Sequence, residues 1–366
     1  MRIAFVISGL GVGGAEAVVC TLADSLASKG HTVKIFYMQG EALVTPSNPN
    51  VELIGLGFNS LLSMFPSVLR YVFAIYKFKP DLIHSHMFHA NILARVCGAP
   101  LFSNAPVICT AHSNNEGGKL RMLSYRITHF RCAAFTSVSA QAAKEYEFKK
   151  AAPQNSILVV SNPIDASKFF FDDSLRKETR KVLDAGPSKV VLAVGRLVEA
   201  KDYFTMIKAF KGVISKQPET RLYIAGDGPL MAETKSYATE LDLNSYVFFL
   251  GKRRDIPALM NAADVFVLSS AWEGFGLVVA EAMATEKIVV ATDCGGVKEV
   301  MGSVGYLVPK QDPSSLSDAL LTALSLPPES AKELGEKARE LVVEKYSVER
   351  IVSCWLKLYS DVSARL

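Results

Sequence analysis

The chain has 366 residues, too many for one small domain and enough for two, and its 49% hydrophobic and 21% charged residues exclude a disordered protein. Its 40 basic and 36 acidic side chains give a net charge of +4, which is too small to indicate a nucleic-acid-binding protein. Residues 1–165 carry 14 basic and 9 acidic side chains (net +5), and the remainder carries 26 and 27 (net −1). All six histidines also lie in the first half, so the two halves are expected to meet different partners.

The amino-terminal apolar segment predicts a buried strand rather than an export signal. Only Arg2 precedes it, glycines interrupt it, and Glu16 stands where a cleavage site would fall. No stretch reaches about 18 uninterrupted apolar residues, so no membrane span is predicted. The six cysteines form no Cys-x-x-Cys pair, which is typical of reduced thiols, and we expect a cytoplasmic protein.

Short apolar runs alternate with helical patterns along the chain. The runs of the first half are Ile3–Ser8, Val33–Met38, Leu82–His84, Val107–Ala111, Ala134–Val138 and Ile157–Val160. Those of the second half are Val190–Val194, Leu222–Ala225, Val247–Phe249, Val265–Leu268, Ile288–Ala291 and Tyr306–Val308. Near-continuous apolar runs are typical of parallel strands covered on both faces. Two successive series therefore indicate an α/β protein with two Rossmann-like, doubly wound domains.

The boundary between the domains is predicted at Ser161–Asp165, where Pro163 and turn-forming residues end the first series. The first domain is then 1–163 and the second 164–345. Ligands of such sheets bind beyond the carboxyl ends of the strands, so we expect the site in the cleft between the domains.

The first strand leads into a glycine-rich turn, Gly9–Gly14, which fits the pattern G-x-G-x-x-G between a strand and a helix. Glycines there let backbone amides approach a diphosphate at a helix N-terminus. An NAD(P)-dependent oxidoreductase is one interpretation, but the acidic residue it needs is missing: the second strand ends near Gln39, and Glu41 lies beyond the turn. A tight turn without a ligand is the structural alternative.

Two carboxylates follow the predicted strand Val265–Leu268. Glu273 lies in a glycine-containing loop, and Glu281 lies about two turns into a helix predicted from Phe275 to Ala284. The helix N-terminus offers unpaired amides to phosphate or hydroxyl oxygens. At 1.5 Å per residue the carboxylates are expected roughly 10 Å apart, which suits the two hydroxyl-rich ends of an elongated ligand. A helix cap with an internal salt bridge is the alternative.

Two cations follow the first strand of the second domain. Arg196 comes directly after Gly195, and Lys201 lies one short loop further on. Arginine offers a planar fork and lysine a point charge, so the pair can hold a pyrophosphate without a metal; a solvated pair is the alternative. The next strand ends in Gly226-Asp227-Gly228-Pro229, where the glycines allow close ligand approach or simply form a turn.

Together these motifs resemble the GT-B retaining glycosyltransferases of the family-4 type. The resemblance covers nearly the whole chain, and its most specific part is the spacing of Glu273 and Glu281 combined with Arg196 and Lys201. It implies the GT-B fold and a nucleoside-diphosphate sugar, most commonly UDP-linked, bound by the second domain. It also implies a C-terminal helix, 346–366, that returns to pack on the first domain. No cofactor and no metal are implied.

The resemblance implies a role for each motif residue. Arg196 and Lys201 would neutralise the donor diphosphate, Glu281 would bind the ribose hydroxyls, and Glu273 would bind the transferred sugar. The other implied donor contacts are Gly13, Gly14, Gly195, Gly226, Gly228, Gly274, Phe275, Gly276 and Leu277. His112, which ends a strand of the first domain, would lie beside the transferred sugar. The alternative is a histidine at the edge of the cleft that takes no part in the chemistry. Since no carboxylate nucleophile is evident, we expect front-face attack, with the leaving phosphate oxygen taking the acceptor proton.

The run His84–His89 contains three histidines and suggests two interpretations. His84 and His86 share one face of a strand, as ligands of a zinc ion would, but no carboxylate or cysteine joins them nearby. Acceptor contacts or packing at the strand end are the other interpretation.

The segment Phe58–Lys79 combines aromatic and aliphatic residues with three basic ones. With Gly117–Arg121 it could place the first domain on an anionic membrane surface, at the inner face of the cell membrane. Ordinary helices covering the sheet, with Pro66 between them, are the alternative. The family resemblance suggests a lipid-linked saccharide acceptor in polysaccharide, O-antigen (lipopolysaccharide) or glycolipid assembly. A two-lobed solute-binding protein remains an alternative, although the export signal it needs is missing.

Overall fold

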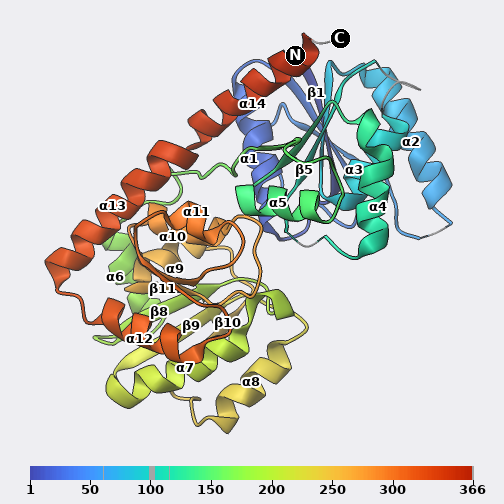
Figure 1. Ribbon diagram of the computed structural model, residues 1–366. Coiled ribbons are helices and arrows are strands. Elements are labelled where there is room, and N and C mark those ends of the chain that lie inside the picture. Colours follow the sequence, from blue (N-terminus) through green and yellow to red (C-terminus); the bar gives the residue numbers. More distant parts are fainter. Residues whose placement is uncertain (61, 99–103, 115, 365–366) are drawn as a thin grey trace. The chain divides into compact units, whose positions relative to one another are not determined.

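The structure is a computed structural model that describes residues 1–60, 62–98, 104–114 and 116–364. The chain divides into two compact units (Figure 1). Unit 1 comprises Met1–Pro163 and Val348–Leu366, and unit 2 comprises Ile164–Ser347.

Unit 1 is built on a parallel sheet with the strand order β3-β2-β1-β4-β5-β6-β7. The strands are β1 Arg2–Gly9, β2 Thr32–Gln39, β3 Glu52–Gly55, β4 Leu82–His86, β5 Val107–Ala111, β6 Ala134–Ser137 and β7 Ile157–Val159. The sequence did not predict β3, a four-residue edge strand without an apolar run of its own, whose only strand partner in the described sheet is β2. β4 is two residues longer than predicted, so His86 belongs to the strand.

Helices cover both faces of this sheet. They are α1 Gly14–Ser28, α2 Met64–Phe78, α3 Phe88–Cys97, α4 Lys119–Thr128, the 3₁₀ turn η1 His129–Arg131, α5 Ala140–Phe148 and α14 Val348–Ser363. Tyr71, Tyr125 and Tyr146 pack from α2, α4 and α5 against one face. Successive strand residues point to opposite faces, and on the other face α14 brings Trp355 against His84. α14 also packs on α1 (Figure 1).

Unit 2 has a second parallel sheet with the strand order β10-β9-β8-β11-β12-β13. The strands are β8 Lys189–Val194, β9 Thr220–Ala225, β10 Val247–Gly251, β11 Val265–Leu268, β12 Ile288–Thr292 and β13 Tyr306–Val308. The helices are α6 Asp173–Val182, η2 Glu199–Lys201, α7 Tyr203–Lys216, α8 Met231–Glu240, α9 Ile256–Ala262, α10 Leu277–Ala284, α11 Val297–Met301, α12 Pro313–Leu324 and α13 Pro328–Tyr346. In Figure 1, α7, α8 and α12 cover one face of the sheet, and α9 and α10 cover the other.

The predicted fold class is confirmed: both units are α/β, with parallel sheets whose order reverses beside the first strand of each series. In such sheets the loops after the central strands meet at one edge, where their side chains can converge on a ligand. Two helix boundaries differ from the sequence prediction. Pro66 lies in the first turn of α2 instead of separating two helices, and α10 begins at Leu277 instead of Phe275.

None of the helices in the described part of the chain is both long and apolar enough to cross a bilayer.

Candidate functional site

The loops after β8 and β9 pack directly on each other at the carboxyl edge of the unit 2 sheet. The amide of Gly195 donates to the carbonyl of Ala225 at 3.0 Å, and the hydroxyl of Tyr203 donates to the carbonyl of Gly195 at 3.0 Å. Gly226 has φ +151°, and a Cβ there would overlap the Gly195 carbonyl. A side chain at Gly228 would likewise overlap the backbone of Leu197. Both glycines therefore have a packing reason to be glycine that needs no ligand.

The structure brings Lys201 and Glu273 together, so the internal salt bridge of the alternative interpretation exists at Glu273, with a partner that the sequence did not predict. The Lys201 ammonium forms an ion pair with Oε1 of Glu273, and Ser270 donates to the same oxygen at 2.7 Å. Ser269 holds the backbone beside Lys201 by donating to the Lys201 carbonyl at 2.8 Å. The two charged side chains are only 19% and 14% exposed, so water screens this pair less than it screens surface pairs. The other carboxylate oxygen, Oε2, accepts no hydrogen bond from the described residues.

Arg196 differs from Lys201 in its surroundings. It is exposed, and its guanidinium has no hydrogen bond or ion pair with any residue in the described ranges. A guanidinium offers five donors in a rigid fork that matches phosphate oxygens. Of the two predicted cations, Arg196 is therefore the one whose charge stands uncompensated.

The loop Gly274–Gly276 leads into α10. Gly276 caps the helix with φ +91°, a backbone conformation that side chains rarely adopt, so glycine is required here. Phe275 is buried, and its ring packs edge-on against Tyr346 at 5.3 Å, so it anchors the loop. The amides of Leu277 and Val278, at the start of the helix, have no acceptor among the described residues. They add partial positive charge at the same edge as Arg196.

Glu281 lies one turn into α10, closer to its start than the predicted two turns. It is half-buried, and its carboxyl forms no ion pair within the described part of the chain. Burial raises the pKa of Glu281 to about 8, although the charges of Lys168 and Lys201 oppose the shift. At pH 7 the group is therefore mostly a neutral carboxylic acid, which can donate one hydrogen bond and accept others.

The other predicted residues lie in unit 1, at the ends of β1 and β5. Gly13 is the N-cap of α1, and Gly14 is its first residue. A Cβ at Gly13 would overlap the carboxylate of Glu16, which lies in the first turn of α1, where the helix dipole favours a negative charge. His112 follows β5, and its Nε2 is 2.9 Å from Nδ1 of His86. Burial lowers the pKa of His112 to about 4, so its ring is neutral at pH 7.

The predicted alternative of a zinc site at His84 and His86 finds no support. Both nitrogens of His84 are 2.7 Å from hydroxyl groups, those of Tyr359 and Thr110. No group of three or more potential metal ligands occurs among the described residues. Packing at the strand end, the other interpretation, accounts for His84.

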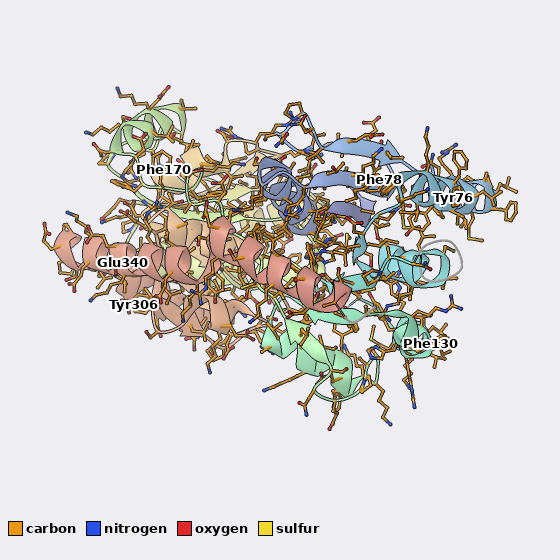
Figure 2. All side chains as sticks on the ribbon, turned by 90° about the horizontal axis from the view of Figure 1, so that it is seen from above. Tyr76, Phe78, Phe130, Phe170, Tyr306 and Glu340 are labelled. Atoms are coloured by element: carbon orange, nitrogen blue, oxygen red, sulfur yellow. The ribbon has the colours of Figure 1, made fainter. Side chains whose placement is uncertain are left out.

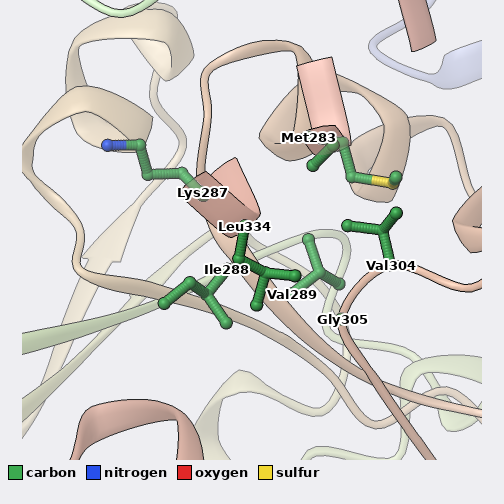
Figure 3. A pocket seen from close by; sticks show the side chains of 8 residues that line it. Met283, Lys287, Ile288, Val289, Val304, Gly305 and Leu334 are labelled. Carbon is green, nitrogen blue, oxygen red and sulfur yellow. The ribbon is translucent and has the colours of Figure 1, made fainter. Parts of the chain in front are cut away.

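A small hollow lies elsewhere in unit 2, between α10, the start of β12 and α13 (Figure 3). Its lining is apolar except for Lys287, whose ammonium stacks on the ring of Phe171 at 4.8 Å. It lies at the amino end of β12, whereas the candidate residues lie at the carboxyl ends of the strands. We assign it no role in binding.

Comparisons with known proteins match both units. Residues 12–168 match the family model described as Glycosyltransferase Family 4, and residues 176–341 match the one described as Glycosyl transferases group 1. The chain is 30% identical to the N-acetyl-alpha-D-glucosaminyl L-malate synthase of Bacillus anthracis over 57% of its own length and 55% of that relative, so it spans about half of that protein. It is 27% identical, over 99% of both chains, to the Campylobacter jejuni GalNAc-alpha-(1->4)-GalNAc-alpha-(1->3)-diNAcBac-PP-undecaprenol alpha-1,4-N-acetyl-D-galactosaminyltransferase. The crystal structure of Anabaena HepE in complex with UDP and glucose superposes with a TM-score of 0.86 and 21% identity, over 99% of this chain and 100% of that one.

Proposed function

Since the chain belongs to the group 1 glycosyl transferases of the family-4 type, with the GT-B fold, we propose that it transfers a hexose-type sugar from a UDP-linked donor to a saccharide hydroxyl, with retention of configuration. The observation that carries the proposal is the edge of the unit 2 sheet. There an uncompensated Arg196, the pair Lys201–Glu273 and the free amides of α10 follow neighbouring strands.

The charge of the departing diphosphate is the main problem that the reaction poses. Arg196 and the first amides of α10 supply fixed positive potential for it. Lys201 adds a charge whose position is set by Glu273 and by the serine-bound backbone. A preorganised cation needs no rearrangement when the negative charge grows, and this is usually the largest electrostatic contribution to catalysis.

The two carboxyl groups are assigned to hydroxyl groups of the donor. Glu273 keeps Lys201 in place with Oε1, and its Oε2 would accept from a hydroxyl of the transferred sugar. Glu281, neutral at pH 7, would both donate to and accept from the ribose diol. From unit 1, we assign His112 to a contact with the transferred sugar.

Retention follows from attack on the face that the diphosphate leaves. The bond from the anomeric carbon to the phosphate oxygen breaks, and a bond to the acceptor oxygen forms on the same face. The acceptor proton passes to the leaving phosphate oxygen, so no side-chain nucleophile and no metal are required.

The test is release of UDP from a panel of nucleotide sugars, with and without a membrane lipid extract. We expect Arg196→Ala to lower the rate by about 100-fold or more, because it removes a positive charge that stabilises the departing diphosphate. Lys211→Ala, which removes an exposed cation of α7 in the same unit, is the matched control and should leave the rate unchanged. Equal rates for the Arg196 variant and the control would refute the assignment of the diphosphate.

The proposed acceptor is a lipid-linked saccharide of surface-polysaccharide assembly. The Campylobacter jejuni relative is named for an acceptor linked to undecaprenol. α2 and α4 of this chain supply an independent argument, because each exposes apolar side chains at helical spacing. These are Phe65, Leu69, Phe73 and Tyr76 on α2, and Leu120, Leu123, Ile127 and Phe130 on α4 and η1. Figure 2 labels Tyr76 and Phe130.

Charge supports contact of these helices with an anionic membrane. Neither α2 nor α4 contains an acidic residue. Exposed basic residues accompany the apolar ones: Lys77, Lys79, Lys119 and Arg126. Apolar area and basic charge together bind the interface of a bilayer with anionic lipids.

Co-sedimentation with vesicles tests the membrane contact. Vesicles containing phosphatidylglycerol should bind the protein, and pure phosphatidylcholine vesicles should bind it less. Phe73 is 67% exposed, and Phe73→Ser should weaken binding by about tenfold, because insertion of a phenylalanine side chain contributes about 1.5–3 kcal/mol. Phe170→Ser, on the surface of unit 2, is the matched control. If binding depends neither on lipid charge nor on Phe73, the proposed membrane contact is refuted.

A further inference from the structure

A chain of hydrogen bonds crosses the sheet face beneath α14. The hydroxyls of Thr136 and Thr110 are 2.7 Å apart, and that of Thr136 is also 3.2 Å from the carbonyl of Cys109. Nε2 of His84 is 2.7 Å from the Thr110 hydroxyl, and Nδ1 of His84 is 2.7 Å from the Tyr359 hydroxyl. Both nitrogens of His84 therefore have a hydrogen-bond partner.

His86 lies on the same strand face, but its hydrogen bonds are incomplete. It is fully buried, and its ring lies against that of His84, tilted by 38°, with the centroids 4.1 Å apart. Its Nδ1 faces Nε2 of His112 at 2.9 Å. The other nitrogens of this pair, Nε2 of His86 and Nδ1 of His112, are buried and have no partner among the described residues.

Burial lowers the pKa of both imidazoles, so each ring of the pair carries one proton at pH 7. Two arrangements are then compatible with the bond between them. In the first, His86 donates from Nδ1, and His112 carries its proton on Nδ1. In the second, His112 donates from Nε2, and His86 carries an unsatisfied proton on Nε2. Each arrangement leaves one N–H and one lone pair without a partner.

The difference in burial decides between them. An unsatisfied buried N–H costs about 1–3 kcal/mol and is rarer in proteins than an unsatisfied acceptor. Both unsatisfied nitrogens are buried, but His86 is buried as a whole residue, whereas His112 is half-buried in the loop after β5. The first arrangement places the free N–H on His112, the residue nearer the surface, and a ligand oxygen that reached Nδ1 would remove the cost.

We propose that His86 is a positioning residue of the transfer reaction: by donating to Nε2 of His112, it fixes His112 as a neutral hydrogen-bond donor through Nδ1. The ligand group that fits this donor is an oxygen acceptor, here a hydroxyl of the transferred sugar, so this part rests on the proposed function. His84 cannot take the same role, because its partners already use both of its nitrogens.

Imidazole ¹⁵N NMR of the protein labelled at histidine tests the arrangement directly, because protonated and bare nitrogens resonate far apart. The spectrum of His112→Gln assigns the His112 signals. We expect the proton on Nδ1 in both His112 and His86 at pH 7. A proton on Nε2 of His112 would overturn the proposal.

Turnover of UDP-glucose, followed as UDP release, tests the consequence with two variants of His86. His86→Leu removes the donor and should lower kcat by about tenfold or more, with little change in KM. His86→Asn keeps an N–H near the position of Nδ1 and should restore most of the rate and the His112 tautomer. Equal losses in both variants would mean that His86 only fills space.

Tyr359→Phe is the matched control, because it removes a buried hydrogen bond from the same face without touching the pair. It should lower stability and leave kcat unchanged. If NMR shows the reversed tautomers of His86 and His112 while turnover is normal, only the proposed pairing is refuted. If NMR shows the predicted tautomers but no nucleotide sugar, UDP-glucose included, yields UDP, the proposed function is refuted and the pairing stands.

Discussion

Replacing Glu281 by glutamine should make the protein more stable, and the gain should grow with pH. The pKa of Glu281 is about 8 in the folded protein and about 4.5 in the unfolded chain, because burial disfavours the charged form. Its raised folded-state pKa makes a contribution to stability that is fully present below pH 4.5. This contribution is lost as the pH rises through 8, because the unfolded chain releases its proton first. Glutamine does not titrate, so the variant does not lose this stability as the pH rises.

The magnitude follows from the two pKa values. At about 1.4 kcal/mol per pH unit, the complete loss is about 5 kcal/mol. Integration of the linkage relation between pH 6 and pH 8 gives a decrease of about 2 kcal/mol in the free energy of unfolding. For a unit of this size, that corresponds to a decrease of about 4–8 °C in the Tm of the wild-type protein relative to the variant.

Thermal unfolding of both proteins at pH 6 and pH 8, followed by circular dichroism, measures this difference. Glu340→Gln is the matched control, because it removes an exposed carboxylate from α13 of the same unit (Figure 2). Its Tm should follow that of the wild type at both pH values. If the difference between wild type and Glu281→Gln is the same at pH 6 and pH 8, then Glu281 is ionised in the folded protein and the reasoning is wrong.

Three other predictions concern the same edge of unit 2. Gly226→Ala should destabilise the protein by about 3 kcal/mol, seen as a lower urea midpoint, because its Cβ would overlap the Gly195 carbonyl; an unchanged midpoint would contradict the packing. Glu273→Gln should lower kcat for sugar transfer more than it weakens UDP binding in calorimetry, and equal losses would remove its assigned role. UDP binding should weaken from pH 7 to pH 9 as Glu281 ionises, and Glu281→Gln should abolish this dependence; stronger binding at pH 9 would show that the ribose hydroxyls prefer the carboxylate.

The main elements of the fold can be predicted from the sequence because burial on both faces leaves a continuous apolar run in each central strand. β3 is an exception, because it is a short edge strand with a polar first residue. It forms by pairing with β2. The predicted start of α10 is wrong for a related reason. Apolar spacing continues through Phe275, but Gly276 adopts φ +91° and forces the helix to begin after it.

Contacts between side chains of distant segments lie beyond sequence reasoning. The strand-end positions of Arg196 and Lys201 follow from the pattern of strands. The ion pair between Glu273 and Lys201 depends on how the loops after β8 and β11 fold together. The spacing of these residues in the sequence does not predict it. The same holds for His86: its i, i+2 relation to His84 is visible in the sequence, but its bond to His112 requires the register of β4 against β5.

These contacts change the charge of the candidate site from that suggested by counting residues. Two cations and two carboxylates would cancel, and a neutral site would do little for a diphosphate. In the structure Glu273 compensates Lys201, and burial holds Glu281 neutral at pH 7, so the charge of Arg196 remains. The amides of α10 add partial positive charge beside Arg196, although the residues from 166 onward carry a net charge of −1. The raised pKa of Glu281, which costs stability, thus also removes one negative charge from the edge to which we assign the diphosphate.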